Sequence, residues 1–135
     1  EIHIFIDLCA TGTKQERNDK INRLIQGVYS IAMFMIESGI PQAYIWYDKV
    51  NGVIQEYSVE QEEELYWMFQ ELFRSKTTTE ESELMEAYVD WGKGRLLESA
   101  LYLTVADHES LDSGNLVRDR LEVMDLRGDV IEDQE

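Results

Sequence analysis

The chain has 135 residues, of which 44% are hydrophobic and 30% charged, a composition typical of one folded domain rather than a disordered segment. Its 28 acidic and 12 basic residues give a formal net charge of -16, which disfavours binding to nucleic acid or to an anionic membrane surface. A lone cysteine, Cys9, excludes a disulfide framework within the chain, and no apolar run approaches the roughly 20 residues of a membrane span.

The first forty residues predict a strand followed by a long helix. Ile2–Ile6 is rich in β-branched and aromatic residues, which indicates a strand buried on both faces, and Asp7 ends it. After a loop at 11–13, we expect Asn18 or Asp19 to cap a helix that ends at Gly39. The apolar stripe of this helix recurs at helical spacing and comprises Ile21, Leu24, Ile25, Val28, Ile31, Ala32 and Met35.

A hairpin is predicted next. Ala43–Tyr47 and Val53–Tyr57 both have strand character, and Asn51-Gly52 between them is the strongest short-range signal for an antiparallel pair. Trp46, with its neighbour Tyr47, is a candidate for an exposed contact surface on this hairpin.

The second half of the chain predicts three further helices and two strands. Ser58 with Gln61 resembles a capping box for a helix with apolar residues from Leu65 to Phe73. Thr78 with Glu81 could cap the next helix, which carries Leu84, Ala87, Tyr88 and Trp91 and is broken by Gly92 and Gly94. A strand over 101–105 then leads to Asp107. The apolar residues Leu116, Val117, Leu121 and Met124 predict a last helix, and a turn at Arg127-Gly128 precedes a short strand at Val130-Ile131.

This order of elements predicts an α/β fold with three layers, in which a mostly parallel sheet with one antiparallel strand carries helices on both faces. Sites in such sheets form beyond the carboxyl ends of the strands. If the strand over 101–105 lies beside Ile2–Ile6, Asp7 and Asp107 reach the same crevice. Carboxylate and hydroxyl oxygens at that place would suit Mg²⁺.

The segment Asp7-Leu8-Cys9-Ala10-Thr11 resembles the Asp-x-Ser-x-Ser motif of von Willebrand factor A domains. The order of elements, including the hairpin, is also similar to that family. More narrowly, the chain resembles bacterial proteins of unknown function that carry a von Willebrand A-like region and accompany MoxR-type ATPases, over roughly residues 2–131. The resemblance implies one Rossmann-like domain spanning residues 1–135, which we expect to be a piece of a longer protein.

The resemblance also implies a metal-ion-dependent adhesion site. Asp7 matches the motif aspartate, Thr11 its second hydroxyl, Thr78 the loop threonine and Asp107 the later aspartate. Cys9 stands where the first serine hydroxyl should bind, and a soft thiol is a poor Mg²⁺ ligand. The implied site is therefore degenerate, with no cofactor or weakly bound Mg²⁺.

The function that this resemblance implies is a non-enzymatic protein–protein interaction module. A MoxR-type AAA+ ATPase is the candidate partner, and neither nucleic acid nor direct membrane contact is expected. A cytoplasmic location is favoured for this domain, although the parent protein could be membrane-anchored.

Several alternatives stay open. Asp7-x-Cys9-x-Thr11 also resembles the Asp-x-Asp-x-Thr motif of haloacid dehalogenase-like phosphatases, in which Asp7 would be the nucleophile and Cys9 replaces the general acid. Cys9 could pair with His108 as a nucleophile, or simply be a small buried apolar residue. The two aspartates could only satisfy backbone amides, the threonine cluster at 77–79 could only cap a helix, and the whole domain could be purely structural.

Overall fold

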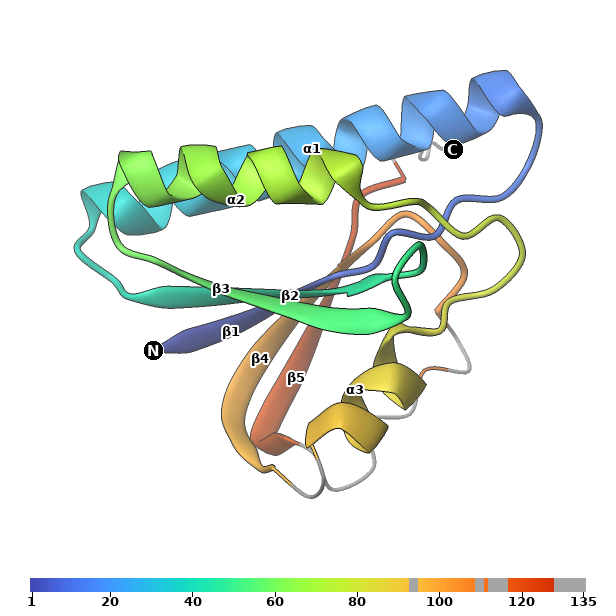
Figure 1. Cartoon of the computed structure of the whole chain (residues 1–135). Helices are drawn as coiled ribbons and strands as arrows, with labels where there is room; N and C mark the ends of the chain where they lie inside the picture. Colours follow the sequence, from blue (N-terminus) through green and yellow to red (C-terminus); the bar gives the residue numbers. More distant parts are fainter. Residues whose placement is uncertain (93–94, 109–110, 112–116, 128–135) are drawn as a thin grey trace, which may run out of the picture.

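The protein has an α/β fold, as predicted from the alternation of strands and helices. The computed structural model describes residues 1–92, 95–108, 111 and 117–127. Within these residues, five strands form one sheet in the order β3-β2-β1-β4-β5 (Figure 1). The elements are β1 (Ile2–Ile6), α1 (Lys14–Glu37), β2 (Gln42–Asp48), β3 (Val53–Val59), α2 (Glu62–Arg74), α3 (Leu84–Gly92), β4 (Leu97–Thr104) and β5 (Val117–Asp125).

The centre of the sheet is β1, which pairs in parallel with β2 on one side and with β4 on the other. Ile4 lies between Tyr44 and Leu101 in this register. The expectation that the first and fourth strands run side by side in the same direction is therefore confirmed. β5 continues the parallel sheet beyond β4, whereas β3 is antiparallel to β2 and lies at the opposite edge.

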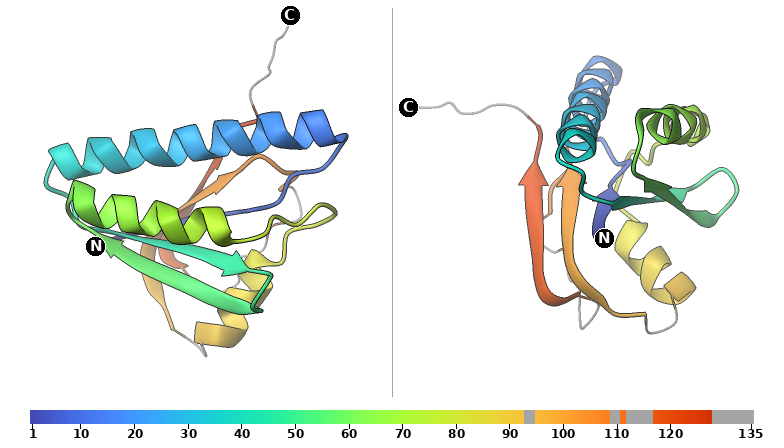
Figure 2. Two further views of the ribbon diagram at one scale, coloured as in Figure 1. Left: turned by 45° about the horizontal axis from the view of Figure 1, so that its top comes forward. Right: turned by 90° about the vertical axis from the view of Figure 1, so that its left-hand side faces the viewer.

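Helices cover both faces of the sheet, as Figure 2 shows. α1 and α2 lie side by side on one face, where alternate residues of the central strands, such as Ile4 and Ile6, pack against Leu24 of α1 and Met68 of α2. α3 packs on the other face, where Phe5 meets Tyr88, Ile45 and Tyr102. The strand period of two explains this division, because successive side chains of β1 point to opposite faces and both faces are buried.

The hairpin has the predicted turn but not the predicted exposure. Gly52 has a φ of 66°, a conformation that glycine adopts without the steric penalty of a side chain. Trp46 is fully buried, so the expectation of an exposed contact surface at this residue is wrong. Its ring stacks on Tyr57 at 5.3 Å, and its indole N–H donates to Ser75 Oγ at 2.8 Å, because this face of β2 lies under α2.

Helices α1 and α2 are capped by residues other than those predicted. α1 starts after Thr13, which forms a capping box with Glu16, so the chain becomes helical about one turn before Asn18 and Asp19. α2 starts after Gln61, which forms its capping box with Glu64, while Ser58 belongs to β3. In both cases the residue that caps the helix is followed three positions later by a glutamate, which accepts a hydrogen bond from the backbone N–H of the capping residue.

The third helix is not capped by Thr78. α3 begins at Leu84, whose backbone N–H donates to Ser82 Oγ at 3.4 Å. Thr78 instead forms an isolated parallel bridge with Cys9. Tertiary pairing therefore determines the position of this threonine, rather than its local helix-capping tendency.

The predicted last helix is a strand. β5 pairs in parallel with β4, and its residues Val117, Leu121 and Val123 pack with the α3 face of the sheet. A spacing of four residues fits both helical and strand periods, which is why the pattern of apolar residues was ambiguous. β4 itself begins at Leu97, four residues before the predicted start. Leu116, Gly128 and Val130-Ile131 lie outside the described residues.

No helix within the described parts of the chain is both long enough and apolar enough to cross a membrane.

Candidate functional site

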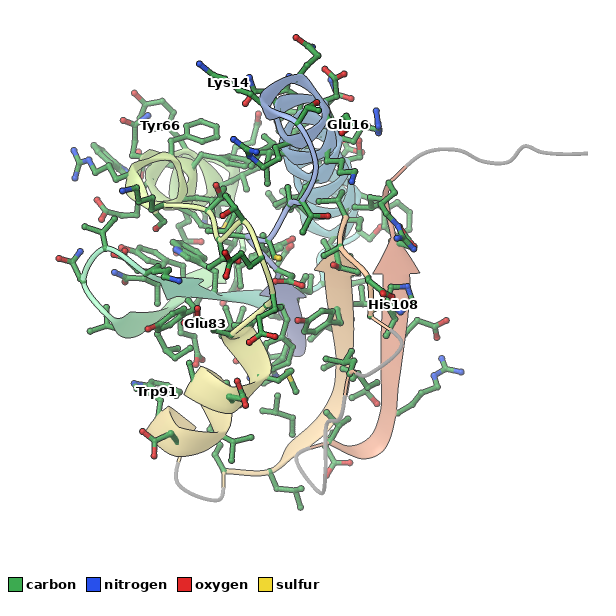
Figure 3. All side chains as sticks on the ribbon, turned by 90° about the vertical axis from the view of Figure 1, so that its right-hand side faces the viewer. Lys14, Glu16, Tyr66, Glu83, Trp91 and His108 are labelled. Atoms are coloured by element: carbon green, nitrogen blue, oxygen red, sulfur yellow. The ribbon has the colours of Figure 1, made fainter. Side chains whose placement is uncertain are left out.

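A cavity of about 770 Å³ lies at the carboxyl ends of β1 and β4. Asp7, Thr11 and Asp107, three of the four predicted site residues, line it together. Ser82, in the connection before α3, and Met85, in the first turn of α3, form another side of the cavity. Figure 3 views the molecule from the side at which β1 ends, with Glu83 immediately before α3 and His108 in the segment after β4. The crossover topology therefore brings together residues separated by about a hundred positions in the chain.

Asp7 is the buried carboxylate of this cavity, with 3% of its surface exposed. Its Oδ1 accepts a hydrogen bond from Ser82 Oγ at 2.7 Å, and its Oδ2 accepts one from Thr104 Oγ1 at 3.1 Å. Ser82 Oγ also lies 3.2 Å from the hydroxyl of Tyr102. Burial raises the pKa of Asp7 above its ordinary value, and these hydroxyl groups only partly offset that effect. The carboxyl group is thus held by neutral hydroxyl partners in a buried site that makes its ionised form less favourable than it is in water.

The loop that carries Thr11 is fixed by the first turns of α1. Lys20 Nζ donates to the Thr11 carbonyl at 3.1 Å, and the Arg17 guanidinium donates to the Gly12 carbonyl at 2.7 Å. Both contacts use long side chains that extend back along the helix from positions that face the loop. The loop that contains Thr11 and Gly12 at the end of the Asp7–Thr11 motif, called the motif loop below, is therefore attached to the helix that follows it.

Thr78 links the connection between α2 and α3 to the motif loop by hydrogen bonds. Its N–H donates to the Leu8 carbonyl at 2.7 Å, and its own carbonyl accepts from Ala10 N–H at 3.0 Å. The Thr78 hydroxyl also donates to the Leu8 carbonyl, at 3.4 Å. Thr78 is buried and is not among the residues that line the cavity. Its position thus differs from that of a metal-binding hydroxyl directed into the cavity.

Cys9 is almost completely buried at the floor of the cavity. Burial raises the pKa of its thiol, which favours the neutral form and works against nucleophilic reactivity. His108 lines the same cavity, and its Nε2 lies 3.3 Å from Asp125 Oδ2. The alternative of a small buried apolar residue is the one that this environment favours for Cys9.

Acidic side chains dominate the rim of the cavity. Glu80, Glu81, Glu86 and Asp107 line it, whereas its described lining contains neither lysine nor arginine. The chain as a whole also carries a formal charge of -16. The resulting negative potential attracts cationic groups and repels anions such as phosphate esters.

Comparisons of this chain with protein-family models, with curated proteins and with solved structures find no match.

Three of the four predicted Mg²⁺ ligands, Asp7, Thr11 and Asp107, line the cavity, whereas Thr78 does not. The hydroxyl of Thr78 is directed to a backbone carbonyl, and both oxygens of Asp7 accept hydrogen bonds from hydroxyl groups. The described residues contain no group of three or more His, Cys, Asp or Glu side chains that could hold a metal ion.

We expect about 10 mM Mg²⁺ to raise the melting temperature by less than about 2 °C, because stabilisation by a ligand grows only with its occupancy. Differential scanning fluorimetry would measure the shift. Cys9→Ser supplies a hard oxygen at the cavity floor, and we expect it to enlarge the shift in melting temperature caused by Mg²⁺. A shift of several degrees in the unaltered protein that Asp7→Ala abolishes would show that the native residues already bind the ion.

Sequence reasoning missed three residues that hold Asp7: Ser82, Tyr102 and Thr104. Thr104 is the last residue of β4 and therefore lies at the same carboxyl edge, so the predicted pairing of β1 with β4 could have identified it. Ser82 is 75 positions away in a connection between two helices. No local pattern in the sequence marks it as a partner of Asp7.

Proposed function

We propose that this chain is a non-enzymatic protein-interaction module of the von Willebrand A-like type, which binds its partner at the cavity around Asp7, Thr11 and Asp107. The observation that supports it most is the position of the cavity between the carboxyl ends of β1 and β4. From β1 the chain crosses to β2 on one side, and later it returns to β4 on the other. This is the point at which open α/β sheets form binding crevices.

The chemistry of the rim favours a basic segment of a protein partner. A lysine or arginine side chain entering the cavity would meet Glu80, Glu81 and Glu86 at its mouth. Attraction between such groups increases the association rate and weakens as salt is added. The MoxR-type ATPase remains the candidate partner through the resemblance of the motif segment. The proposal keeps the expected cytoplasmic location, in which a free cysteine stays reduced.

The same features make a phosphatase the weaker candidate. A phosphate monoester is a dianion and would approach several carboxylates, with neither lysine nor arginine in the described lining to offset them. Hydrolysis of an aryl phosphate that is lost in Asp7→Asn would establish the enzymatic alternative.

The test uses two charge reversals on one helix. Glu86 lines the cavity, whereas Asp90, one turn later in α3, does not, and both are exposed. We expect Glu86→Lys to weaken binding of a MoxR-type ATPase from the same organism by about tenfold or more, and Asp90→Lys to change it less than about twofold. Biolayer interferometry at two salt concentrations would measure both dissociation constants.

Equal weakening by the two variants would mean that only net charge matters and that the cavity is not the binding site. Tight binding by the unaltered protein that neither variant changes would also contradict the proposal. Melting curves of both variants would confirm that each has kept its fold, since Glu86 and Asp90 are both on the solvent-exposed side of α3.

A further inference from the structure

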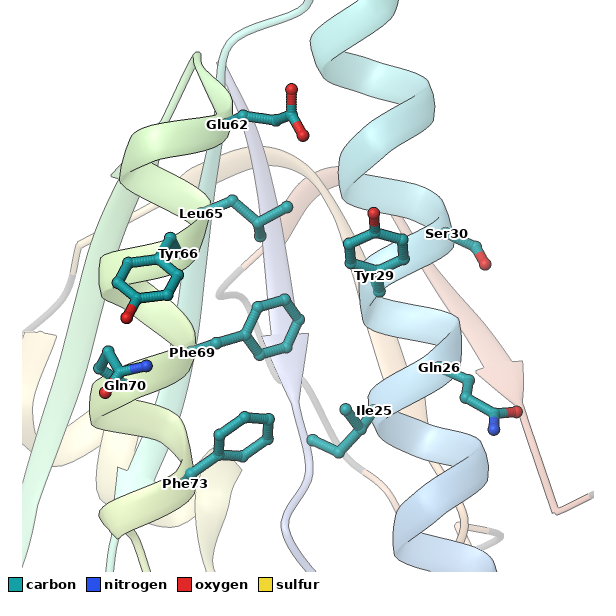
Figure 4. Close-up of a pocket in the computed structure, with 10 residues that line it drawn as sticks. All are labelled: Ile25, Gln26, Tyr29, Ser30, Glu62, Leu65, Tyr66, Phe69, Gln70 and Phe73. Carbon is teal, nitrogen blue, oxygen red and sulfur yellow. The ribbon is translucent and has the colours of Figure 1, made fainter.

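A second hollow lies in the layer formed by α1 and α2. It shares no lining residue with the cavity around Asp7, Glu81 and Glu86, called the acidic cavity below. It is a groove of about 750 Å³ between α1 and α2, drawn in Figure 4. Ile25 and Tyr29 reach into it from α1, and Leu65, Phe69 and Phe73 from α2. The Tyr29 and Phe69 rings are 6.4 Å apart, and Phe69 stacks on Phe73 at 5.5 Å. The groove is therefore lined by a continuous series of aromatic side chains.

The aromatic side chains of this groove remain accessible to solvent. Tyr29 is 51% exposed and Phe73 is 62% exposed, although the chain is strongly charged overall. Contiguous apolar surface of this kind is uncommon on monomeric proteins and is characteristic of interaction sites. A hydrophobic groove of this kind commonly binds the apolar face of an amphipathic helix.

Charge differs between the two ends of the groove. The first turn of α2 carries Glu62 and Glu63, both exposed, and α1 ends with Glu37 on the same side of the molecule (Figure 1). At the far end of α2, Phe73 is followed by Arg74 and then by Lys76. Neither lysine nor arginine is among the described residues that line the groove itself. A helix that fits this surface would carry apolar residues along one face and basic residues at the end beside Glu62.

We propose that the groove binds an amphipathic helix of a protein partner, with basic residues against the acidic end of α2. The 13 residues of α2 span about 20 Å, which suits a helix of three to four turns with apolar residues at positions i, i+3 or i+4, and i+7. A second copy of the chain is the weaker candidate, because it would bring another net charge of -16 to the interface. This surface extends the proposed function, since one domain could hold two segments of protein at once.

The probe is a synthetic helical peptide of about four turns, with leucine at i, i+3, i+4 and i+7 and lysines in its final turn. A control peptide carries glutamates in place of those lysines. Fluorescence anisotropy would measure binding to the full chain. We expect the lysine peptide to bind at least about tenfold more tightly than the glutamate peptide. Glu62→Gln combined with Glu63→Gln should reduce that preference to within about threefold.

Two aromatic substitutions on α2 provide the matched comparison. Phe73 lines the groove, whereas Trp67 does not, and their exposed fractions are 62% and 60%. Phe73→Ser is expected to weaken binding of the lysine peptide about tenfold or more, while Trp67→Ser leaves it within about twofold. Circular dichroism melts would show that both variants are folded.

Failure of the lysine peptide to bind, or equal weakening by the two serine variants, would overturn the proposal. So would a concentration-dependent dimer in sedimentation analysis that Phe73→Ser dissociates, because the groove would then belong to a second copy. The charge test on Glu62 and Glu63 remains informative even if an aromatic variant fails to fold. None of these measurements depends on the acidic cavity, so the two proposals can fail separately.

Discussion

Trp46→Ala is expected to lower the free energy of unfolding by about 3–5 kcal/mol, the usual cost of truncating a fully buried tryptophan. The side chain has no exposed surface and fills the space between β2 and α2. Its removal eliminates the stacking on Tyr57 and the hydrogen bond to Ser75 Oγ, and it leaves a cavity that the surrounding helices cannot fill. A loss of this size would be a large part of the stability of a domain of this length.

Denaturation by urea, followed by circular dichroism, would give the free energies. Trp67→Ala is the control, because this tryptophan lies on α2 with 60% of its surface exposed and should cost less than about 1 kcal/mol. Similar losses in the two variants would contradict the placement of Trp46 in the core. Since Trp46 belongs to the hairpin, the measurement also tests the position of the β2–β3 pair under α2.

Asp7→Asn is expected to stabilise the protein at pH 8 and to lose this advantage as the pH falls toward 4. Burial raises the pKa of Asp7 in the folded protein above that in the unfolded chain. The folded state therefore binds the proton more tightly, and the stability that the protonated group provides is lost as the pH rises through the folded pKa. Asparagine avoids burying the charge while it can still accept a hydrogen bond from Ser82 or Thr104.

We expect a gain at pH 8 of about 0.5–2 kcal/mol, the range of single stabilising substitutions. Urea denaturation of both proteins at several pH values would measure it, and the difference between them cancels the titration of all other groups. Asp107→Asn is the matched control, because Asp107 lines the same cavity but is exposed, so its variant should change the free energy of unfolding little. A loss of stability in Asp7→Asn at every pH would mean that the ionised carboxylate is favoured in its site.

A destabilising effect of the buried Asp7, measured as above, would also be informative about function. Residues that are unfavourable for folding are found most often where a binding or catalytic site requires them. Asp7 lies at the base of the acidic cavity, and its removal would therefore be expected to stabilise the fold while weakening the proposed interaction. These opposite effects can be measured on the same variant.

Much of the architecture was predictable because it depends on local patterns. The β-branched run Ile2–Ile6, the turn at Asn51-Gly52 and the helical stripe ending near Gly39 each specify one element without help from distant residues. The alternation of these elements then implies a mostly parallel sheet. Parallel pairing of β1 with β4 is sufficient to bring Asp7 and Asp107 to one cavity.

The errors occurred where two local interpretations were equally good. The spacing of Val117 and Leu121 fits a helix as well as a strand. The segment is a strand because its backbone pairs in parallel with β4. Thr78 has the side chain of a helix cap, yet its backbone pairs with the motif loop because that loop offers the Leu8 carbonyl and the Ala10 N–H. Trp46 was expected on the surface because the sequence does not reveal which face of a hairpin a helix will cover.

By itself, the sequence determined the α/β class, most of the elements and the placement of acidic residues after two strands, since hydrophobic period and turn chemistry act over a few residues. Only the tertiary structure decided that Ser82 and Thr104 hold Asp7, that Thr78 fixes the motif loop, and that α1 and α2 leave an apolar groove between them. Each of these contacts joins residues far apart in the chain, and the packing of the sheet against its helices is what brings them together.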